Sequence, residues 1–156
     1  MNQSVNKEIV LICDIGGTNV RFGLYDEGQK GNVYFDAKYK CSEFTSFEEA
    51  VSTYLSTKSK KPTLCVIGAA GNIDEYNGEV LTTNTPWKAS TSKLRQQCPF
   101  FKHIRLENDF ALQGWAVEEL TRAQYRSVLS TSEQQKNLKE GSLVLIGPGP
   151  GLGTCL

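Results

Sequence analysis

The sequence predicts an α/β fold whose sheet combines antiparallel and parallel strands. Three strand-like segments come first, and helical and strand-like segments then alternate along the chain. Three consecutive strands with short turns favour an antiparallel meander, whereas strand, helix and strand in succession favour a parallel pair. With 156 residues, 39 % hydrophobic and 22 % charged, the chain can bury a core of this kind, so disorder of the whole chain is not expected.

The composition narrows the classes of function. Seventeen basic and seventeen acidic residues cancel, so no net field attracts the chain to nucleic acid or to an anionic membrane. The lysines of the KSKKP segment at 58–62 are typical of a solvated loop. No apolar run approaches the ~20 residues that span a bilayer, and the polar first residues do not resemble a signal peptide. We therefore expect a cytoplasmic protein with neither a nucleic-acid partner nor a membrane partner.

The cysteines and the histidine predict no metal centre. Five cysteines are scattered without a CxxC pair, which fits neither a disulfide framework nor a zinc site. Cys13 and Cys65 lie within apolar runs and are expected in the core. The one histidine, His103, has Lys102 and Arg105 nearby and is expected at the surface.

The first three strands are predicted from their apolar patterns. Residues 8–15 form a short, continuously apolar run with β-branched side chains, which favours a buried strand. Residues 19–28 alternate apolar and polar side chains and end in an acidic glycine turn, and residues 32–41 repeat the alternation. Together these segments predict the meander.

The first helix is predicted over residues 47–56. Ser46 and Glu49 have the spacing of a capping box, which marks the start of a helix. Five apolar residues then fall on one helical face: Phe47, Ala50, Val51, Tyr54 and Leu55. After a break at Pro62, residues 63–71 read as a buried strand that ends in a glycine turn, so the helix connects two parallel strands.

The remaining elements continue the alternation. We expect a short strand and loop at 77–87, a polar helix at 90–98, a strand at 102–109, and a helix at 109–120 that starts at or beside Asp109. Residues 121–140 are polar and weakly patterned, as at a boundary between structural units. Residues 141–156 begin another strand and a glycine-rich turn with no obvious neighbour to pair with, and we expect the chain to be cut there.

Two glycine turns could hold phosphate, GGT at 16–18 and GPGPGLG at 147–153. Glycine allows backbone N–H groups to converge on an anion at close range. Neither turn matches the Walker A or the dinucleotide signature. A simple hairpin or loop is therefore the alternative for each turn.

Polar residues beside the first turn strengthen the phosphate interpretation. Asp14 ends the first strand, where a carboxylate could face a magnesium ion or its water shell next to phosphates. Thr18 adds a hydroxyl and Asn19 adds an amide. An Asx turn, in which Asp14 organises the hairpin, explains the same aspartate equally well.

A second group of polar residues stands where another strand gives way to a helix. Glu107, Asn108 and Asp109 are expected at the carboxyl edge of the parallel strands, where ligands of open α/β sheets bind. An aspartate at this edge can accept a proton from an alcohol if it lies within ~3 Å. Asp109 can equally be a helix cap, and both roles are compatible.

Two loops are ambiguous. The TTNTPW segment at 82–87 contains Asn84, threonine hydroxyls and Trp87, which suit a polyhydroxylated ligand beside an amphipathic wall. An ordinary threonine-rich loop is the alternative. The GAAGNI segment at 68–73 is either a simple turn or a place of close backbone approach.

Five motifs together resemble the bacterial-type glucokinases, of the hexokinase and actin-like ATPase superfamily. They are CDIGGTNVRFGLYD, GAAGNI, TTNTPW, LENDFALQGWAV and GPGPGLG, in the family's order and approximate spacing from about residue 9 to residue 153. The resemblance implies an α/β ribonuclease H-like (actin-like ATPase) domain, with a mixed five-stranded sheet and helices on both faces, plus the start of a second domain. Residues 1–110 would form the small domain. Residues 111–156 would form the connecting helix, first strand and phosphate loop of a truncated large domain.

The resemblance also implies a site that binds glucose and ATP with Mg²⁺ and phosphorylates the 6-hydroxyl of glucose. Asp109 would be the general base, Asn108, Asp109 and Asn84 would bind the sugar, and Trp87 would line or support its pocket. Asp14 would bind Mg²⁺ indirectly. The nucleotide phosphates would meet Cys13, Asp14, Ile15, Gly16, Gly17 and Thr18 in the first loop, and Gly149 and Gly151 in the second.

The chain departs from the family in two respects. Pro150 stands where the family usually has threonine, which removes a hydroxyl and an N–H from the second loop. The family also continues with a Glu-Gly-Gly-His segment that holds the sugar, so we expect this chain to be an inactive N-terminal portion. A homodimer formed partly through apolar surface exposed by truncation is compatible with this expectation. The alternatives are a non-catalytic sugar-binding or regulatory remnant and a related hexose kinase.

Overall fold

The computed structural model describes residues 8–26, 33–82, 85, 87–117, 119–126, 128, 143–148 and 152–155. The chain divides into two compact units, Met1–Asp109 and Phe110–Leu156. No helix among the described residues is long and apolar enough to cross a membrane.

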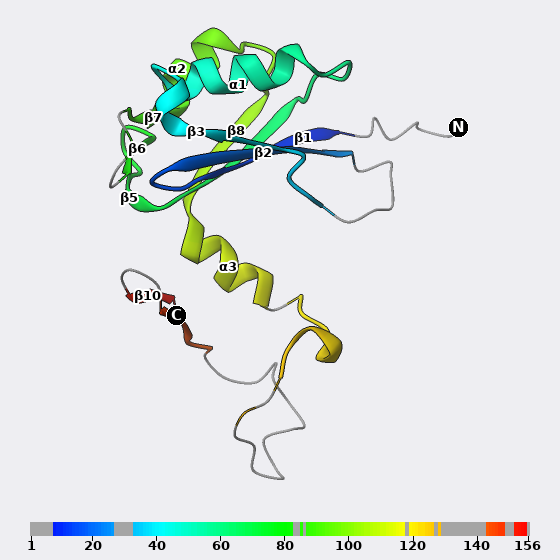
Figure 1. The fold of residues 1–156 in the computed structure, drawn as a ribbon, viewed down its shortest axis with the longest axis vertical. Helices are drawn as coiled ribbons and strands as arrows, with labels where there is room; N and C mark the ends of the chain where they lie inside the picture. The colour runs from blue at the N-terminus through cyan, green and yellow to red at the C-terminus, as the bar shows by residue number, and fades with distance from the viewer. Residues whose placement is uncertain are drawn as a thin grey trace, which may run out of the picture. The chain divides into compact units, whose positions relative to one another are not determined.

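A mixed five-stranded sheet is the centre of the first unit, as predicted (Figure 1). β1 pairs antiparallel with β2, and β2 with β3, which confirms the meander. β1 also pairs parallel with β4, and β4 with β8. The strands, in their order across the sheet, are β3 (Ala37–Lys40), β2 (Asn19–Asp26), β1 (Ile9–Ile15), β4 (Leu64–Ala69) and β8 (His103–Asn108).

The third strand is shorter than predicted. Residues 32–41 alternate like a strand, but β3 occupies only Ala37–Lys40, and its last pair joins Ala37 to Phe22. The backbone carbonyl of Tyr34 lies against Gly23, where a Cβ atom would collide with it. The Asp36 N–H still donates to the Phe22 carbonyl at 2.9 Å, and the residues before it leave the pairing where Gly23 gives them room, which alternation alone does not show.

The first helix, α1 (Phe47–Ser56), has the predicted bounds. The Ser46 hydroxyl accepts a hydrogen bond from the Glu49 N–H at 3.1 Å. The Glu49 carboxylate accepts from the Thr45 N–H at 2.7 Å and from the Thr45 hydroxyl. The helix start is therefore capped as expected, except that the glutamate bonds back to the residue before the cap.

Both helices of the first unit lie on the same face of the sheet (Figure 1). The second is α2 (Thr91–Gln97), which confirms the predicted short polar helix. Of the helices expected on both faces, those described in this unit cover one face only. That face carries Leu11, Cys13 and Ile15 of β1, which are buried.

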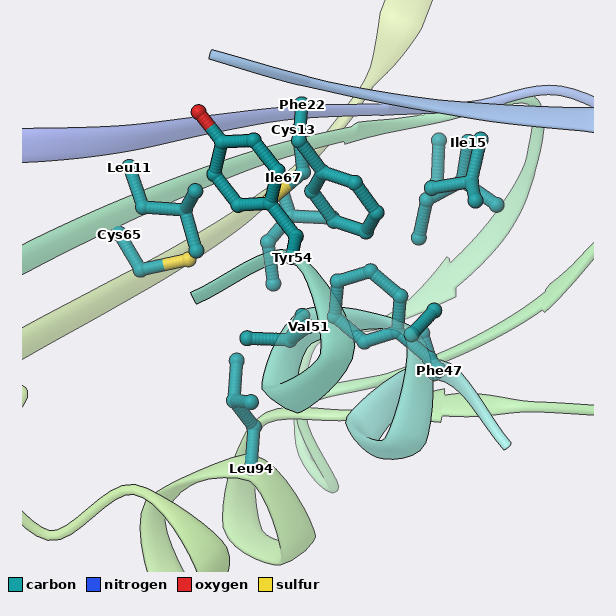
Figure 2. Close-up of a cluster of buried hydrophobic side chains, with 14 of the residues drawn as sticks. Leu11, Cys13, Ile15, Phe22, Phe47, Val51, Tyr54, Cys65, Ile67 and Leu94 are labelled. Atoms are coloured by element: carbon teal, nitrogen blue, oxygen red, sulfur yellow. The ribbon is translucent and has the colours of Figure 1, made fainter. Parts of the chain in front are cut away.

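Aromatic and aliphatic side chains from α1 and the sheet form the core (Figure 2). The ring of Phe22 lies 5.1 Å from that of Tyr54 and 6.3 Å from that of Phe47, measured between centroids. Cys13 and Cys65 belong to this core, as predicted. Burial of the helical face predicted from spacing thus holds α1 on the sheet.

A second, three-stranded sheet was only partly predicted. Its strands are β5 (Gly71–Asp74), β6 (Glu79–Thr82) and β7 (Ala89–Ser90), and only the middle one was expected. A Cβ atom at Gly71 would lie 2.6 Å from the carbonyl oxygen of Leu81 on the paired strand. Of the two interpretations of GAAGNI, close backbone approach is therefore correct at Gly71, and the approaching group is β6.

The lysines of KSKKP are exposed to solvent at least in part, but each has a partner. Lys58 and Lys60 form ion pairs of 2.6 Å with Asp36 and Asp26. The ammonium of Lys61 lies 5.8 Å from the centre of the Phe100 ring. The lysines of this segment therefore contact residues that are distant in the sequence. His103 is exposed, as expected.

The second unit contains most of α3 (Asp109–Val117), the short 3₁₀ helix η2 (Arg122–Gln124), and the strands β9 (Leu145–Pro148) and β10 (Leu152–Cys155). The helix expected at 109–120 ends at Val117. β9 and β10 pair antiparallel. The expectation that the strand after 141 lacks a neighbour was wrong, because its partner follows the glycine turn directly.

Candidate active site

Three parallel strands bring the predicted site residues of the first unit to one edge. In the register, Ile15 of β1 is aligned with Ala69 of β4, which is aligned with Asn108 of β8. The preceding row contains Asp14, Gly68 and Glu107. Asp109 follows Asn108 directly. The carboxyl edge expected to bind a ligand thus carries Asp14 and the Asn108–Asp109 pair.

The first glycine turn is a tight hairpin between β1 and β2. The Gly16 N–H donates to the carbonyl of Asn19 at 2.9 Å, and the carbonyl of Thr18 accepts from the Cys41 N–H at 2.9 Å. Among the described glycines only Gly78 has a positive φ, so backbone conformation does not require glycine at 16 or 17. Thr18 is exposed. The hairpin interpretation is therefore correct for the geometry, and it leaves the small residues open to an approaching ligand.

Asp14 has a partner that the sequence analysis missed. Nη1 of Arg21 donates to Oδ2 of Asp14 at 2.8 Å, and the two side chains are 48 % and 31 % exposed. Asp14 and Arg21 are directly opposite in the β1–β2 register. Among the described residues no backbone N–H of the turn donates to this carboxylate, so the Asx turn is not formed. Alternation on both sides of the short hairpin was the signal that could have identified Arg21.

The other carboxylate in the Asp14 row is also paired with an arginine. Nε of Arg105 donates to Oε1 of Glu107 at 2.8 Å. Gly68 stands between Asp14 and Glu107 in the register and has no side chain to separate them. Both carboxylates of this row, Asp14 and Glu107, are therefore balanced by an arginine from a strand of the same sheet.

Asn108 and Asp109 are placed by the end of β8 and the start of α3. Nδ2 of Asn108 donates to the carbonyl of Gly71 at 3.2 Å, which ties the end of β8 to β5. Asp109 is the first residue of α3, next to the cap position. Its carboxylate therefore sits in the first turn, where the helix dipole favours negative charge.

Trp87 supports the site from within the core. Its side chain is 7 % exposed, its ring lies 6.0 Å from that of Phe47, and its Nε1 donates to the Cys41 carbonyl at 3.1 Å. Of the two roles expected for Trp87, the buried position favours support over lining. The Thr85 hydroxyl donates to the Trp87 carbonyl at 2.9 Å and contacts the hydroxyl of Thr82.

Several predicted site residues lie outside the described part of the chain. They are Asn84, Gly149 and Gly151, together with Pro150. The flanking glycines Gly147 and Gly153 are described, and both lie against the ring of Phe110. The roles predicted for the undescribed residues stay predictions.

The cysteine thiols near the site are buried, unlike its polar groups. Burial raises the pKa of the Cys13 thiol well above its usual value, and the adjacent Cys65 contributes. Burial also raises the pKa of Cys41. Both thiols therefore stay neutral at physiological pH. A role of Cys13 in binding phosphate would have to use its backbone, because its side chain is in the core.

The described residues offer no cage for a metal ion. No three His, Cys, Asp or Glu side chains gather among them. Mg²⁺ usually retains several waters and is held by one or two carboxylates together with substrate phosphates. The partly exposed Asp14 carboxylate fits such an indirect contact.

Comparison with known proteins identifies relatives across most of the chain. The family model named Glucokinase matches residues 11–156. A glucokinase of Caulobacter sp. (strain K31) is 37 % identical over 147 residues, which are 92 % of this chain and 42 % of that protein. A glucokinase-like protein of Xylella fastidiosa (strain Temecula1 / ATCC 700964) is 32 % identical over 150 residues, 94 % of this chain and 43 % of that protein. The chain thus spans less than half the length of these relatives.

Solved structures show the same fold. The glucokinase from an Antarctic psychrotroph superposes with a TM-score of 0.70 at 29 % identity, covering 94 % of this chain and 45 % of that one. The glucokinase from Balamuthia mandrillaris, solved in complex with glucose, has a TM-score of 0.65 at 15 % identity, covering 97 % of this chain and 45 % of that one. The second similarity concerns the fold alone.

Proposed function

Because the chain belongs to the glucokinase family, we propose that it forms part of the active site of a hexose kinase that phosphorylates the 6-hydroxyl of glucose with ATP. The chain spans 42 % of the Caulobacter relative, so the proposal concerns the protein as a whole. We place this activity in the cytoplasm, as the first step of glucose breakdown. The family model and the Caulobacter relative, both named glucokinase, support the choice of sugar.

One observation carries the proposal. The parallel register places Asp14 and the Asn108–Asp109 pair at one edge of the sheet, although nearly a hundred residues separate them in the sequence. Phosphoryl transfer depends mainly on alignment of the two substrates and on neutralisation of charge. An edge with one carboxylate near phosphate and another near a sugar hydroxyl supplies both requirements.

The residues at the sugar end have distinct roles in this proposal. Asp109 accepts the proton of the 6-hydroxyl as that oxygen attacks the γ-phosphorus. Asn108 binds a neighbouring hydroxyl, and its bond to Gly71 orients its amide. Asn84 binds the sugar from the loop before Trp87.

The phosphate end is the hairpin that follows β1. The backbone N–H of Gly17 and the exposed hydroxyl of Thr18 face the phosphates, while the N–H of Gly16 is bonded to the Asn19 carbonyl within the hairpin. Asp14 would hold Mg²⁺ indirectly, and the ion would supply neutralisation of phosphate charge there. Gly149 and Gly151 of the second glycine turn are proposed as nucleotide contacts from the sequence motif alone.

A non-catalytic sugar-binding role is the second candidate. The observation in its favour is the ion pair at 2.8 Å between Arg21 and Asp14, which already neutralises the carboxylate proposed to face Mg²⁺. A protein of this kind would bind glucose without binding nucleotide.

Calorimetry of the chain with glucose and with Mg-ATP tests the two candidates. The kinase proposal expects heat from both titrations, and it expects Asp109→Asn to weaken glucose binding while the matched change Glu107→Gln at the same edge does not. Glucose binding without nucleotide binding favours the second candidate. If Asp109→Asn binds glucose as tightly as the unmodified chain does, the assignment of this edge is wrong. Titration of other hexoses distinguishes glucose from a related substrate.

A further inference from the structure

The second unit contains a socket for an aromatic ring. Gly147 of β9 and Gly153 of β10 are directly opposite in the antiparallel register. A Cβ atom at Gly147 would lie 2.5 Å from Cε2 of Phe110, and one at Gly153 would lie 2.8 Å from Cδ2 and Cε2 of the same ring. The two glycines therefore leave space on one face of the hairpin, and the ring of Phe110, in the first turn of α3, occupies this space.

A second contact lies one helical turn further along α3. Here the glycine is on the helix and the side chain is on the hairpin. A Cβ atom at Gly114 would lie 2.8 Å from Sγ of Cys155. Phe110 and Gly114 are four residues apart and share a face of the helix, while Gly153 and Cys155 share a face of β10. Phe110 of the helix thus packs against the hairpin, and Cys155 of the hairpin packs against the helix. Together the two contacts fix the register and the distance between α3 and the hairpin.

The other face of the hairpin does not take part in this contact. Ile146 and Leu152 point away from α3 and are 59 % and 69 % exposed. The two glycines and Cys155 stand on the face toward the helix. At the two glycine positions a larger residue would push the helix away.

This contact changes the interpretation of the GPGPGLG segment. Its outer glycines, Gly147 and Gly153, are explained by the ring of Phe110 and need no phosphate to account for them. Only the inner glycines, Gly149 and Gly151, remain for close approach to a ligand. Packing and recognition are therefore assigned to different glycines of one motif.

We propose that Phe110 is the positioning residue of the second glycine turn, because its ring holds on α3 the two glycines that flank the turn, Gly147 and Gly153. This inference depends on the proposed function for the phosphate contact, but not for the packing of the ring. Phe110 acts through the hairpin and does not touch the ligand.

Nuclear magnetic resonance of the chain tests the packing directly. An aromatic ring this close displaces the Hα resonances of Gly147 and Gly153 from ordinary values, and Phe110→Leu should return both to those values. Ile146→Ala, on the exposed face of the same hairpin, is the matched control and should leave both shifts in place. The indole N–H signal of the buried Trp87 reports whether the first unit stays folded. Ordinary glycine shifts in the unmodified chain would overturn the proposal.

Titration with Mg-ATP, followed by the same resonances, tests the positioning role. Phe110→Leu and Gly147→Ala should each weaken binding by about tenfold or more, because a small displacement of a binding group is costly. The double variant should regain part of the affinity that Gly147→Ala loses, since leucine makes room for the new methyl group. If phosphate itself needed glycine at 147, the double variant would bind no better than Gly147→Ala alone.

The outcomes separate this inference from the proposed function. If the unmodified chain shows shifted glycine signals but does not bind Mg-ATP, the nucleotide assignment fails and the positioning role fails with it, while the packing stands. If the chain binds Mg-ATP and Phe110→Leu binds it equally well, the positioning role alone is wrong.

Discussion

Replacing Tyr54 with phenylalanine tests how the segment before β3 is held on the core. The Tyr54 side chain is fully buried, and its hydroxyl donates to Oδ1 of Asp36 at 2.8 Å. Figure 2 shows the hydroxyl at the outer end of a ring that otherwise packs among apolar side chains. The other oxygen of Asp36 accepts from Nζ of Lys58 at 2.6 Å. Tyr54→Phe thus removes one of two bonds to a carboxylate and leaves the ring in place.

The expected loss follows from these contacts. A hydrogen bond to a charged group contributes about 1.5–3 kcal/mol. Asp36 keeps Lys58 and is 32 % exposed, so water replaces part of the lost bond. We therefore expect the free energy of unfolding to fall by about 1–2 kcal/mol at pH 7, measured by urea denaturation. The control is Tyr39→Phe, since among the described residues the Tyr39 hydroxyl has no hydrogen bond; it should change stability by less than about 0.5 kcal/mol.

The pH dependence gives a second test. Burial raises the pKa of Asp36, but the hydrogen bonds from Lys58 and Tyr54 outweigh it, and the pKa is lowered from its ordinary value of 3.8. A carboxyl whose pKa is lowered by folding stabilises the protein above its unfolded pKa and loses this contribution as the pH falls through the folded value. The difference between the unmodified chain and Tyr54→Phe should thus be constant down to about pH 5 and shrink below the ordinary pKa. Equal losses at both extremes, or a loss no larger than that of Tyr39→Phe, would refute the reasoning.

Three further substitutions test separate elements of the fold. Ser46→Ala removes the acceptor of the Glu49 N–H and should lower the free energy of unfolding by about 1 kcal/mol in urea; an unchanged midpoint would mean that the cap is unimportant. Gly71→Ala places a Cβ atom 2.6 Å from the backbone oxygen of Leu81 and should destabilise by about 1–3 kcal/mol in thermal unfolding, so a neutral result would contradict the close approach. Leu94→Ala empties a fully buried site under α2 and should destabilise by about 2–5 kcal/mol in calorimetry; a smaller loss would show that the site collapses.

Elements with local signals were predicted closely. The bounds of α1 follow from the cap at Ser46 and from the apolar face that begins at Phe47, and both signals lie within the helix itself. β1 and β4 were recognisable because each is a short apolar run between turns. Parallel pairing then followed from the helix between them, since a crossover is needed to connect such strands.

Features that depend on distant partners were not predictable in this way. β5 and β7 are strands because each pairs with β6, and their own residues have little preference for extended structure. The segment at 33–36 alternates like a strand but loses its partner at Gly23. β9 was expected to stand alone because its partner begins inside a segment that looked like a turn.

The candidate site was predictable in its residue types and much less in its contacts. Asp14 and Asp109 stand at strand ends, which residue type and position suffice to indicate. The ion pair between Asp14 and Arg21 requires the register of the hairpin, which the sequence suggests only after the turn length is known. The outer glycines of GPGPGLG resemble phosphate ligands in sequence, and only the neighbouring ring of Phe110 reveals their packing role.

Two motifs that look independent in the sequence meet at Cys41. The N–H of this residue donates to the Thr18 carbonyl in the first glycine turn, and its carbonyl accepts from Nε1 of Trp87 in the TTNTPW segment. Trp87 in turn lies against Phe47, the first residue of α1. The tryptophan is therefore linked to the first glycine turn through one buried residue, a role that differs from both a ligand-facing wall and an ordinary loop. A ligand that moves the hairpin must therefore also disturb the Cys41 N–H bond to Thr18.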